Sequence, residues 1–145
     1  MLSAEEAELL HVLPGPLIAA GAEGKILFMN PAAADLLGYE DPRALVGRPL
    51  TDLMPARMVE QHRKGFQRYL RTGQSKLLGR RVRVPARTKT GEEKPIDLRI
   101  RMFRRPDGTD LIVAAMGMAD PKESVIDLAV ARLEKTLVER AYQLI

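Results

Sequence analysis

Two blocks of strand-like sequence, separated by a helical block, constrain most strongly what this chain can fold into. Residues 16–29 predict a hairpin, and alternating apolar and polar residues predict strands over about 77–87, 94–104 and 110–118. Short turns join these strands directly, and strands joined in this way pair antiparallel. The order, with helical sequence between the two blocks, therefore predicts an α+β fold with an antiparallel sheet.

Capping residues mark where the predicted helices begin. A Ser-Ala-Glu-Glu capping box precedes a short amphipathic helix over about 3–13. Asn30 followed by Pro31 predicts the start of a second short helix, with the asparagine as its N-cap. A longer helix is predicted over about 55–71, because a proline opens it and a Thr-Gly pair follows it.

The end of the chain predicts a further helix. An Asp-Pro-Lys-Glu segment that begins at residue 120 combines an N-cap, a proline at the first helical position and a glutamate at the third. The pattern after it favours a helix that pairs with a second copy, and the alternative is a helix packed on its own domain. The pattern consists of apolar residues at a and d positions of a seven-residue repeat: Ile126, Val130, Leu133, Leu137 and Leu144.

The composition excludes several classes of protein. The 145 residues include no cysteine, which excludes disulfides, thiolate metal sites and any flavin or thioester-linked chromophore held through a cysteine. The N-terminal segment is acidic, unlike a signal peptide, and the most apolar stretch, residues 9–22, is interrupted by two prolines. That stretch is also too short to span a bilayer. We therefore expect a cytoplasmic protein without a membrane partner.

Positive charge is concentrated in the middle of the chain. Residues 57–105 carry a net charge of +12, whereas residues 1–56 carry −5 and residues 106–145 carry −3. Such a basic region can attract nucleic acid or another anionic partner. The arginines of the strands alternate with apolar residues, however, which is the pattern of a solvated sheet face. Aromatic residues make up only 4% of the chain, which argues against stacking platforms for single-stranded nucleic acid. Because the sequence also contains no helix-turn-helix signature, a nucleic-acid partner is not expected.

Short motifs follow one another in a fixed order over about residues 7–119. They are Gly24-x-Ile26-x-Phe28-x-Asn30-x-Ala32-Ala33, Leu36-Leu37-Gly38-Tyr39, Leu45-Val46-Gly47, Asp52-Leu53-Met54-Pro55, His62, Tyr69, Thr72-Gly73, Gly79-Arg80 and Gly91-Glu92-x-x-Pro95-Ile96-x-Leu98. Together they resemble a PAS domain, the sensory module of many bacterial histidine kinases and cyclic-di-nucleotide enzymes. The motifs are most similar to those of PAS domains from sensor histidine kinases.

The resemblance implies a fold and a general role. PAS domains have a five-stranded antiparallel sheet of order 2-1-5-4-3 with helices over one face, and they sense ligands or bind partners without turning over a substrate. We therefore expect no enzyme activity. We expect a homodimer held by its flanking helices, which acts in a two-component pathway. Its output domain, of histidine kinase or diguanylate cyclase type, is expected to lie outside this chain. The expected parts are a flanking helix over 1–14, the PAS domain over 15–119 and a signalling helix over 120–145.

A ligand pocket is expected between the concave face of the sheet and the helix over 55–71. His62 lies on the apolar stripe of that helix, with Met58 and Phe66 one turn away on either side. In the strands, alternation places the apolar residues on one side. The expected lining is Leu36, Leu37, Met58, His62, Phe66, Leu98, Ile100, Ile112, Ala114 and Met116.

His62 leaves two interpretations open. A neutral imidazole in an apolar pocket suits an axial haem ligand, and the segment around it resembles the haem PAS domain of nitrogen-fixation oxygen-sensor kinases. That resemblance implies that Arg80, or Arg81 if the register shifts, binds the haem-bound oxygen. Many PAS domains without haem share this histidine, and there it is a structural residue hydrogen-bonded within the core. The structural interpretation is favoured, and the identity of any ligand stays open.

Overall fold

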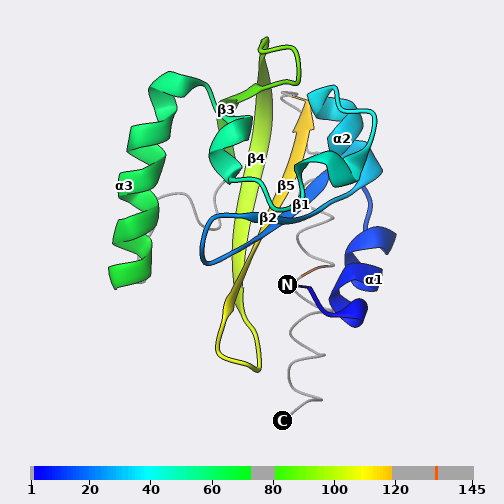
Figure 1. Cartoon of the computed structure of the whole chain (residues 1–145), viewed down its shortest axis with the longest axis vertical. Helices are drawn as coiled ribbons and strands as arrows, with labels where there is room; N and C mark the ends of the chain where they lie inside the picture. The colour runs from blue at the N-terminus through cyan, green and yellow to red at the C-terminus, as the bar shows by residue number, and fades with distance from the viewer. Residues whose placement is uncertain (1, 73–80, 119–132, 134–145) are drawn as a thin grey trace.

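Helices surround a single sheet in the chain's structure, a computed structural model that describes residues 2–72, 81–118 and 133 (Figure 1). Among the described residues, no helix has both the length and the apolar character that crossing a membrane requires. In chain order the elements are α1 (Ala4–Val12), β1 (Leu17–Gly21), β2 (Ile26–Met29), α2 (Pro31–Leu37), the 3-10 turns η1 (Pro42–Leu45) and η2 (Leu50–Leu53), α3 (Ala56–Thr72), β3 (Arg81–Arg87), β4 (Glu93–Arg104) and β5 (Asp110–Met118).

The five strands form one antiparallel sheet in the order β2-β1-β5-β4-β3. This confirms the predicted α+β class and strand order. The central strand is β5, which pairs with β1 on one side and with the long strand β4 on the other. The strand predicted over 77–87 is described from Arg81 onward, and residues 77–80 lie outside the described part of the chain.

The sheet buries apolar side chains on both faces, because successive residues of a strand point to opposite sides. On the inner face, Ile18, Ile96 and Met116 pack with residues of α2. On the outer face, Leu17 and Val113 belong to a second set of buried residues. We call this set the outer cluster: Leu10, Leu17, Ala19, Phe28, Leu111, Val113, Ala115 and Leu133.

Helix α1 packs on the outer face through Leu10, which is fully buried in the outer cluster. The predicted capping box is present: Glu6 N–H donates to Ser3 Oγ at 3.1 Å, and Ser3 N–H donates to Glu6 Oε1 at 2.8 Å. Arg105, after β4, donates to the same glutamate oxygen at 3.3 Å. The chain's own sheet therefore covers the apolar side of α1, so that side does not require a second chain to cover it.

Leu133 is also buried in the outer cluster, with 1% of its surface exposed. The seven-residue repeat had placed this leucine at a contact between two copies. In the structure it packs within its own chain, as the alternative interpretation of that segment expects for this residue. The other residues of the repeat lie outside the described residues.

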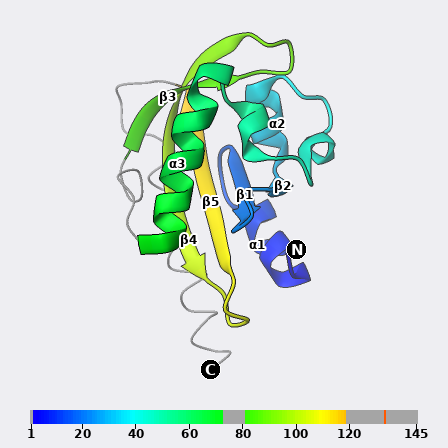
Figure 2. The same ribbon diagram turned by 60° about the vertical axis from the view of Figure 1, so that its left-hand side comes forward.

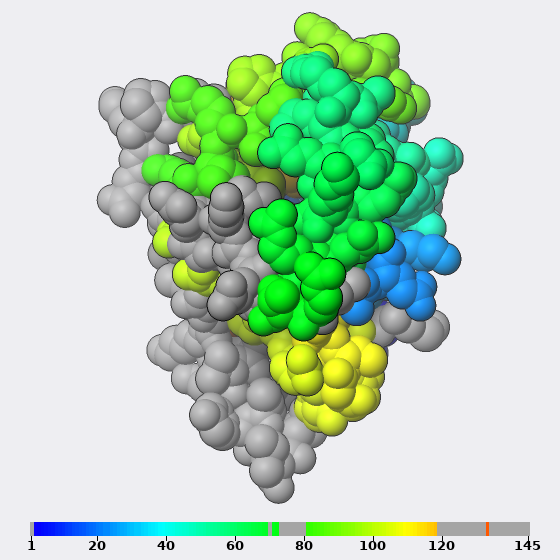
Figure 3. Space-filling view, turned by 90° about the vertical axis from the view of Figure 1, so that its left-hand side faces the viewer, coloured from blue at the N-terminus to red at the C-terminus, as the bar shows by residue number. Residues whose placement is uncertain are grey.

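Helix α3 lies across the sheet on the same side as α2 (Figure 2). Its first turn is tied to β4 by Arg57, whose two terminal nitrogens donate to the Glu93 carboxylate at 2.6 and 2.7 Å. In Figure 3, which faces the side of the molecule that carries α3, this helix forms the surface and extends toward the β4–β5 hairpin. The described side chains of α3 are half-buried or exposed, and none is fully buried.

Candidate functional site

The strand residues predicted to line a pocket share the inner face. Across β4 and β5, Leu98 pairs with Met116 and Ile100 pairs with Ala114, so these side chains lie on one side of the sheet. Met116 is buried, whereas Leu98, Ile100 and Ala114 are half-buried. The inner face is thus apolar but incompletely covered along this part of β4 and β5.

Near α2 the same face is tightly packed. Leu37 is fully buried and belongs to the cluster that also contains Ile18, Ile96 and Met116, which we call the inner core. Leu36 and Leu98 pack against this core. Ile112 on β5 is also buried, with 8% of its surface exposed. Leu37 and Ile112 are therefore buried, and the half-buried stretch of Leu98, Ile100 and Ala114 lies between Met116 and Ile112 along the sheet.

The three predicted residues of α3 lie one turn apart on the same side of the helix. Met58, His62 and Phe66 are all half-buried. The rings of His62 and Phe66 are adjacent, with centroids 5.8 Å apart and planes inclined by 37°. Two partly exposed apolar surfaces, one on α3 and one on the sheet, thus border the space in which the sequence predicted a ligand.

The electrostatic environment of His62 favours its neutral form. Burial lowers the pKa of the imidazole below its usual value of 6.5, and the positive charge of the adjacent Arg63 lowers it further. Within the described residues, the imidazole makes no hydrogen bond to the protein. The structural interpretation of His62 expects a hydrogen bond within the core, and the described part of the chain does not supply one.

The structure describes only one of the two arginines that were expected to bind a haem-bound oxygen. Arg80 lies outside the described residues. Arg81 pairs with Arg99 across β3 and β4, and its Nε lies 4.0 Å from the Asp97 carboxylate. Arg99 and Asp97 alternate with the inner-face residue Leu98, so Arg81 belongs to the outer face. It therefore points away from the sheet surface that lies beneath His62.

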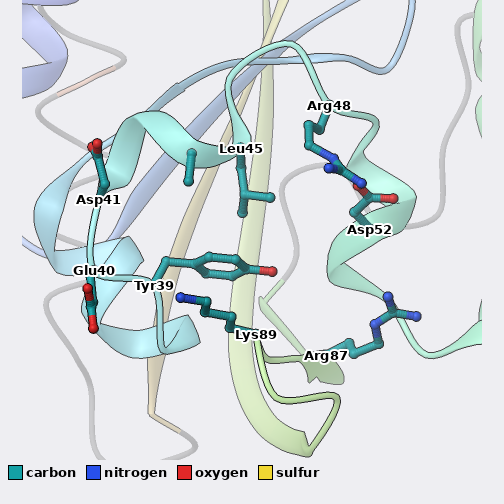
Figure 4. Close-up of a pocket in the computed structure, with 9 residues that line it drawn as sticks. Tyr39, Glu40, Asp41, Leu45, Arg48, Asp52, Arg87 and Lys89 are labelled. Carbon is teal, nitrogen blue, oxygen red and sulfur yellow. The ribbon is translucent and has the colours of Figure 1, made fainter.

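A concave site lies beside α2, where the sequence patterns did not predict one. It encloses about 430 Å³ between the loop after α2, the two 3-10 turns and the β3–β4 hairpin (Figure 4). Arg87 and Lys89, two cations beside the hairpin turn, are the signal in the sequence that could have drawn attention to it. The lining residues are Tyr39, Glu40, Asp41, Ala44, Leu45, Arg48, Asp52, Arg87 and Lys89.

Sequence comparison places nearly the whole described domain in one family. A family model described as the PAS fold matches residues 5–118. An uncharacterized protein of Azorhizobium caulinodans is 34% identical over 89 residues, which cover 61% of this chain. The matched region spans only 12% of that relative, which is a much longer protein.

Solved structures with the same fold come from bacteria and from an insect. A PAS domain from Desulfitobacterium hafniense has a TM-score of 0.60 at 17% identity, and the match covers 77% of this chain and 98% of that one. A domain of a sensory box sensor histidine kinase/response regulator from Geobacter sulfurreducens gives 0.53 at 21% identity, covering 74% and 88%. The PAS-B domain of Drosophila melanogaster Cycle, in a variant with bound glycerol, gives 0.54 at 17% identity, covering 70% and 97%.

Proposed function

Because this chain belongs to the PAS-fold family, whose members are sensory modules of signalling proteins, we propose that it senses a small ligand bound between α3 and the inner face of the sheet. The observation that carries the proposal is the environment of His62. A desolvated, neutral imidazole lies on a side of α3 where the apolar side chains of Met58 and Phe66 are also only half-buried. Protein interiors are normally close-packed, so facing apolar surfaces that stay partly exposed suit a small molecule.

The chemistry of this surface indicates the kind of ligand. Met58 and Phe66 on α3, and Leu98 and Ile100 on β4, offer apolar contact. His62 is the polar group among them, and as a neutral ring it can donate one hydrogen bond and accept another. A ligand that is mainly apolar, with one hydrogen-bonding group, matches this set. The Cycle domain with bound glycerol illustrates that a PAS domain can hold a small polar molecule.

Haem is the alternative ligand, and one observation favours it. His62 keeps a neutral imidazole that no described residue engages in a hydrogen bond, which is the state an axial ligand requires. Arg81, on the outer face, does not suit the role of binding a haem-bound gas, which leaves Arg80 for that role. The surface beneath α3 fits an apolar macrocycle in its chemistry, with His62 as the residue that would hold the iron.

A spectrum of the purified protein decides between these ligands. The protein should be expressed with added haem precursor, and its ultraviolet–visible spectrum recorded before and after denaturation, with mass spectrometry of any released molecule. We expect a colourless protein that does not bind hemin stoichiometrically and that releases a small organic molecule. A sharp Soret band that disappears in His62→Ala would establish the haem alternative instead.

Variants of α3 test whether the ligand lies where we propose. His62→Ala and Phe66→Ala should each reduce the amount of co-purified ligand, because both side chains belong to the half-buried side of α3 that we propose contacts the ligand. Gln61→Ala, a substitution at the exposed neighbour of His62, is the matched control and should leave the ligand content unchanged. Equal ligand content in all three variants would place the binding site elsewhere.

We further propose that the chain transmits ligand binding to an output domain of histidine kinase or diguanylate cyclase type. Two findings support this: a structural neighbour is a domain of a sensor histidine kinase/response regulator, and the Azorhizobium relative extends far beyond the matched region. When this chain is fused to an output domain of one of these types, ligand should change the turnover of that domain. His62→Ala should remove that dependence while basal turnover persists.

A further inference from the structure

The concave site beside α2 has the volume of a small-molecule site, and it is separate from the surface beneath α3. Its volume of about 430 Å³ falls within the range of roughly 300–1,000 Å³ that is usual for such sites. Leu45, at 4% exposure, and the half-buried ring of Tyr39 form its apolar part, and both pack with the inner core. The apolar part of the pocket is therefore held by the buried core on the inner face of the sheet.

Two of the three acidic residues of the pocket are already paired. Asp41 accepts hydrogen bonds from the backbone and side chain of Arg43, and these bonds lower the pKa of its carboxyl group. Asp52 accepts a hydrogen bond from Arg48 Nε at 2.6 Å. Glu40 and Asp41 lie at one side of the pocket in Figure 4, whereas the Tyr39 hydroxyl points toward the opposite side. Arg87 and Asp52, whose carboxylate is bonded to Arg48, lie on the side of the hydroxyl, whereas the Lys89 ammonium lies on the side of Glu40.

Two cations of the pocket remain available. Within the part of the chain that the structure describes, neither Arg87 nor Lys89 forms an ion pair. Glu93 is the cross-strand neighbour of Arg87, but its carboxylate is occupied by both terminal nitrogens of Arg57. The lining holds three cations and three carboxylates, and Arg43, which pairs with Asp41 from outside the lining, leaves the described residues around the pocket with one positive charge in excess.

The hairpin that carries these cations is fixed in place. Lys89 N–H donates to the Leu37 carbonyl oxygen at 3.0 Å, which joins the hairpin to the C-terminal end of α2. Thr88 donates from its backbone and from its hydroxyl to the Glu92 carbonyl oxygen, at 2.8 and 3.0 Å. A pocket whose backbone is fixed before binding loses less conformational entropy when a ligand enters.

We propose that this pocket binds a small organic anion, whose carboxylate or phosphate group contacts Arg87 and whose apolar body packs against Tyr39, while Lys89 adds positive charge on the other side of the Tyr39 ring. Charge-assisted hydrogen bonds from arginine and lysine to such groups are among the stronger polar contacts in proteins. The Tyr39 hydroxyl, for which the described residues provide no hydrogen-bond partner, can donate to the same anion. This proposal does not depend on a ligand beneath α3.

Titrations of the ¹⁵N-labelled full chain, followed by amide chemical shifts, test the proposal. The probes are benzoate, phenyl phosphate, inorganic phosphate and the uncharged benzyl alcohol. We expect saturable shifts at Tyr39 and Lys89 with benzoate or phenyl phosphate, and the tighter of the two identifies the anionic group. Inorganic phosphate should bind more weakly and benzyl alcohol should not saturate.

Charge-matched variants supply the control. Arg87→Gln combined with Lys89→Gln should weaken binding by at least about tenfold, as expected when charge-assisted hydrogen bonds are lost. Lys64→Gln combined with Arg68→Gln removes the same charge from the exposed side of α3 and should leave the affinity unchanged. The proposal is wrong if both double variants bind equally well, if both lose binding equally, or if the shifts occur at His62 and Phe66 instead. Equal binding of inorganic phosphate and phenyl phosphate would disprove a contact with an apolar body.

Discussion

Asn30 shows how much of the fold one polar side chain can hold. It is 4% exposed, and its Oδ1 accepts hydrogen bonds from the N–H groups of Leu17 at 3.0 Å and Ala33 at 2.9 Å. Its Nδ2 donates to the Gly15 carbonyl oxygen at 2.7 Å. The sequence identified Asn30 as the N-cap of α2, but its bonds to Gly15 and Leu17 also join that helix to the start of β1.

We expect Asn30→Ala to lower the free energy of unfolding by about 2–4 kcal/mol, because the change removes a helix cap and leaves a buried backbone N–H without a partner. Urea denaturation measures this loss. Asn30→Ser is the control, since it keeps a side-chain oxygen that can cap α2 and loses the donor to Gly15, and it should fall between the wild type and the alanine variant. A loss below about 0.5 kcal/mol in Asn30→Ala would show that the three bonds contribute little.

His62 should make stability depend on pH. Its pKa is lowered in the folded chain, so the unfolded chain binds the proton more readily. The stability associated with the neutral ring is therefore present above the usual pKa of 6.5 and is lost as the pH falls below it. Between pH 8 and pH 5, the wild type should lose more free energy of unfolding than His62→Gln, measured by denaturation at each pH. Equal losses would mean that the ring is as accessible to protons in the folded chain as in the unfolded one.

At the scale of the element, α1 should be anchored by a single side chain. Leu10 is fully buried, whereas Val12 on the same helix is 72% exposed. Leu10→Ala should lower the free energy of unfolding by about 2–4 kcal/mol, because it opens a cavity in the outer cluster. Val12→Ala is the matched control and should change it by less than about 0.5 kcal/mol. Hydrogen exchange along α1 should rise in the first variant only, and a similar rise in both would contradict this role of Leu10.

At the scale of the whole molecule, the homodimer stays a prediction. Leu10 and Leu133 pack within their own chain, so a dimer would have to use other parts of the flanking segments. We expect sedimentation of the full chain at about 100 μM to show a dimer, since ordinary specific contacts saturate well below that concentration. Removal of residues 121–145 should weaken the association. A monomer at that concentration would rule out the predicted dimer.

The sequence by itself determined the elements and the fold. Turn and cap residues are local signals, and the described elements begin and end close to the predicted positions because backbone geometry at a proline, a glycine or a capping asparagine depends on few neighbours. Alternation along β4 and β5 likewise placed Leu98, Ile100, Ala114 and Met116 on one face, since the pleat fixes the side to which each residue points. These patterns, with the family motifs, were sufficient to predict the strand order.

Only the tertiary structure decided how completely those faces are covered. Spacing placed Leu133 on an apolar stripe, but whether that stripe meets its own sheet or another chain depends on contacts between residues far apart in the sequence. The same holds for the pocket beside α2, where Tyr39 and Lys89 are brought together by a bond from the β3–β4 hairpin to the end of α2. The sequence determines which side of an element is apolar, because periodicity is local, whereas burial and ion pairing depend on which other elements lie against that side.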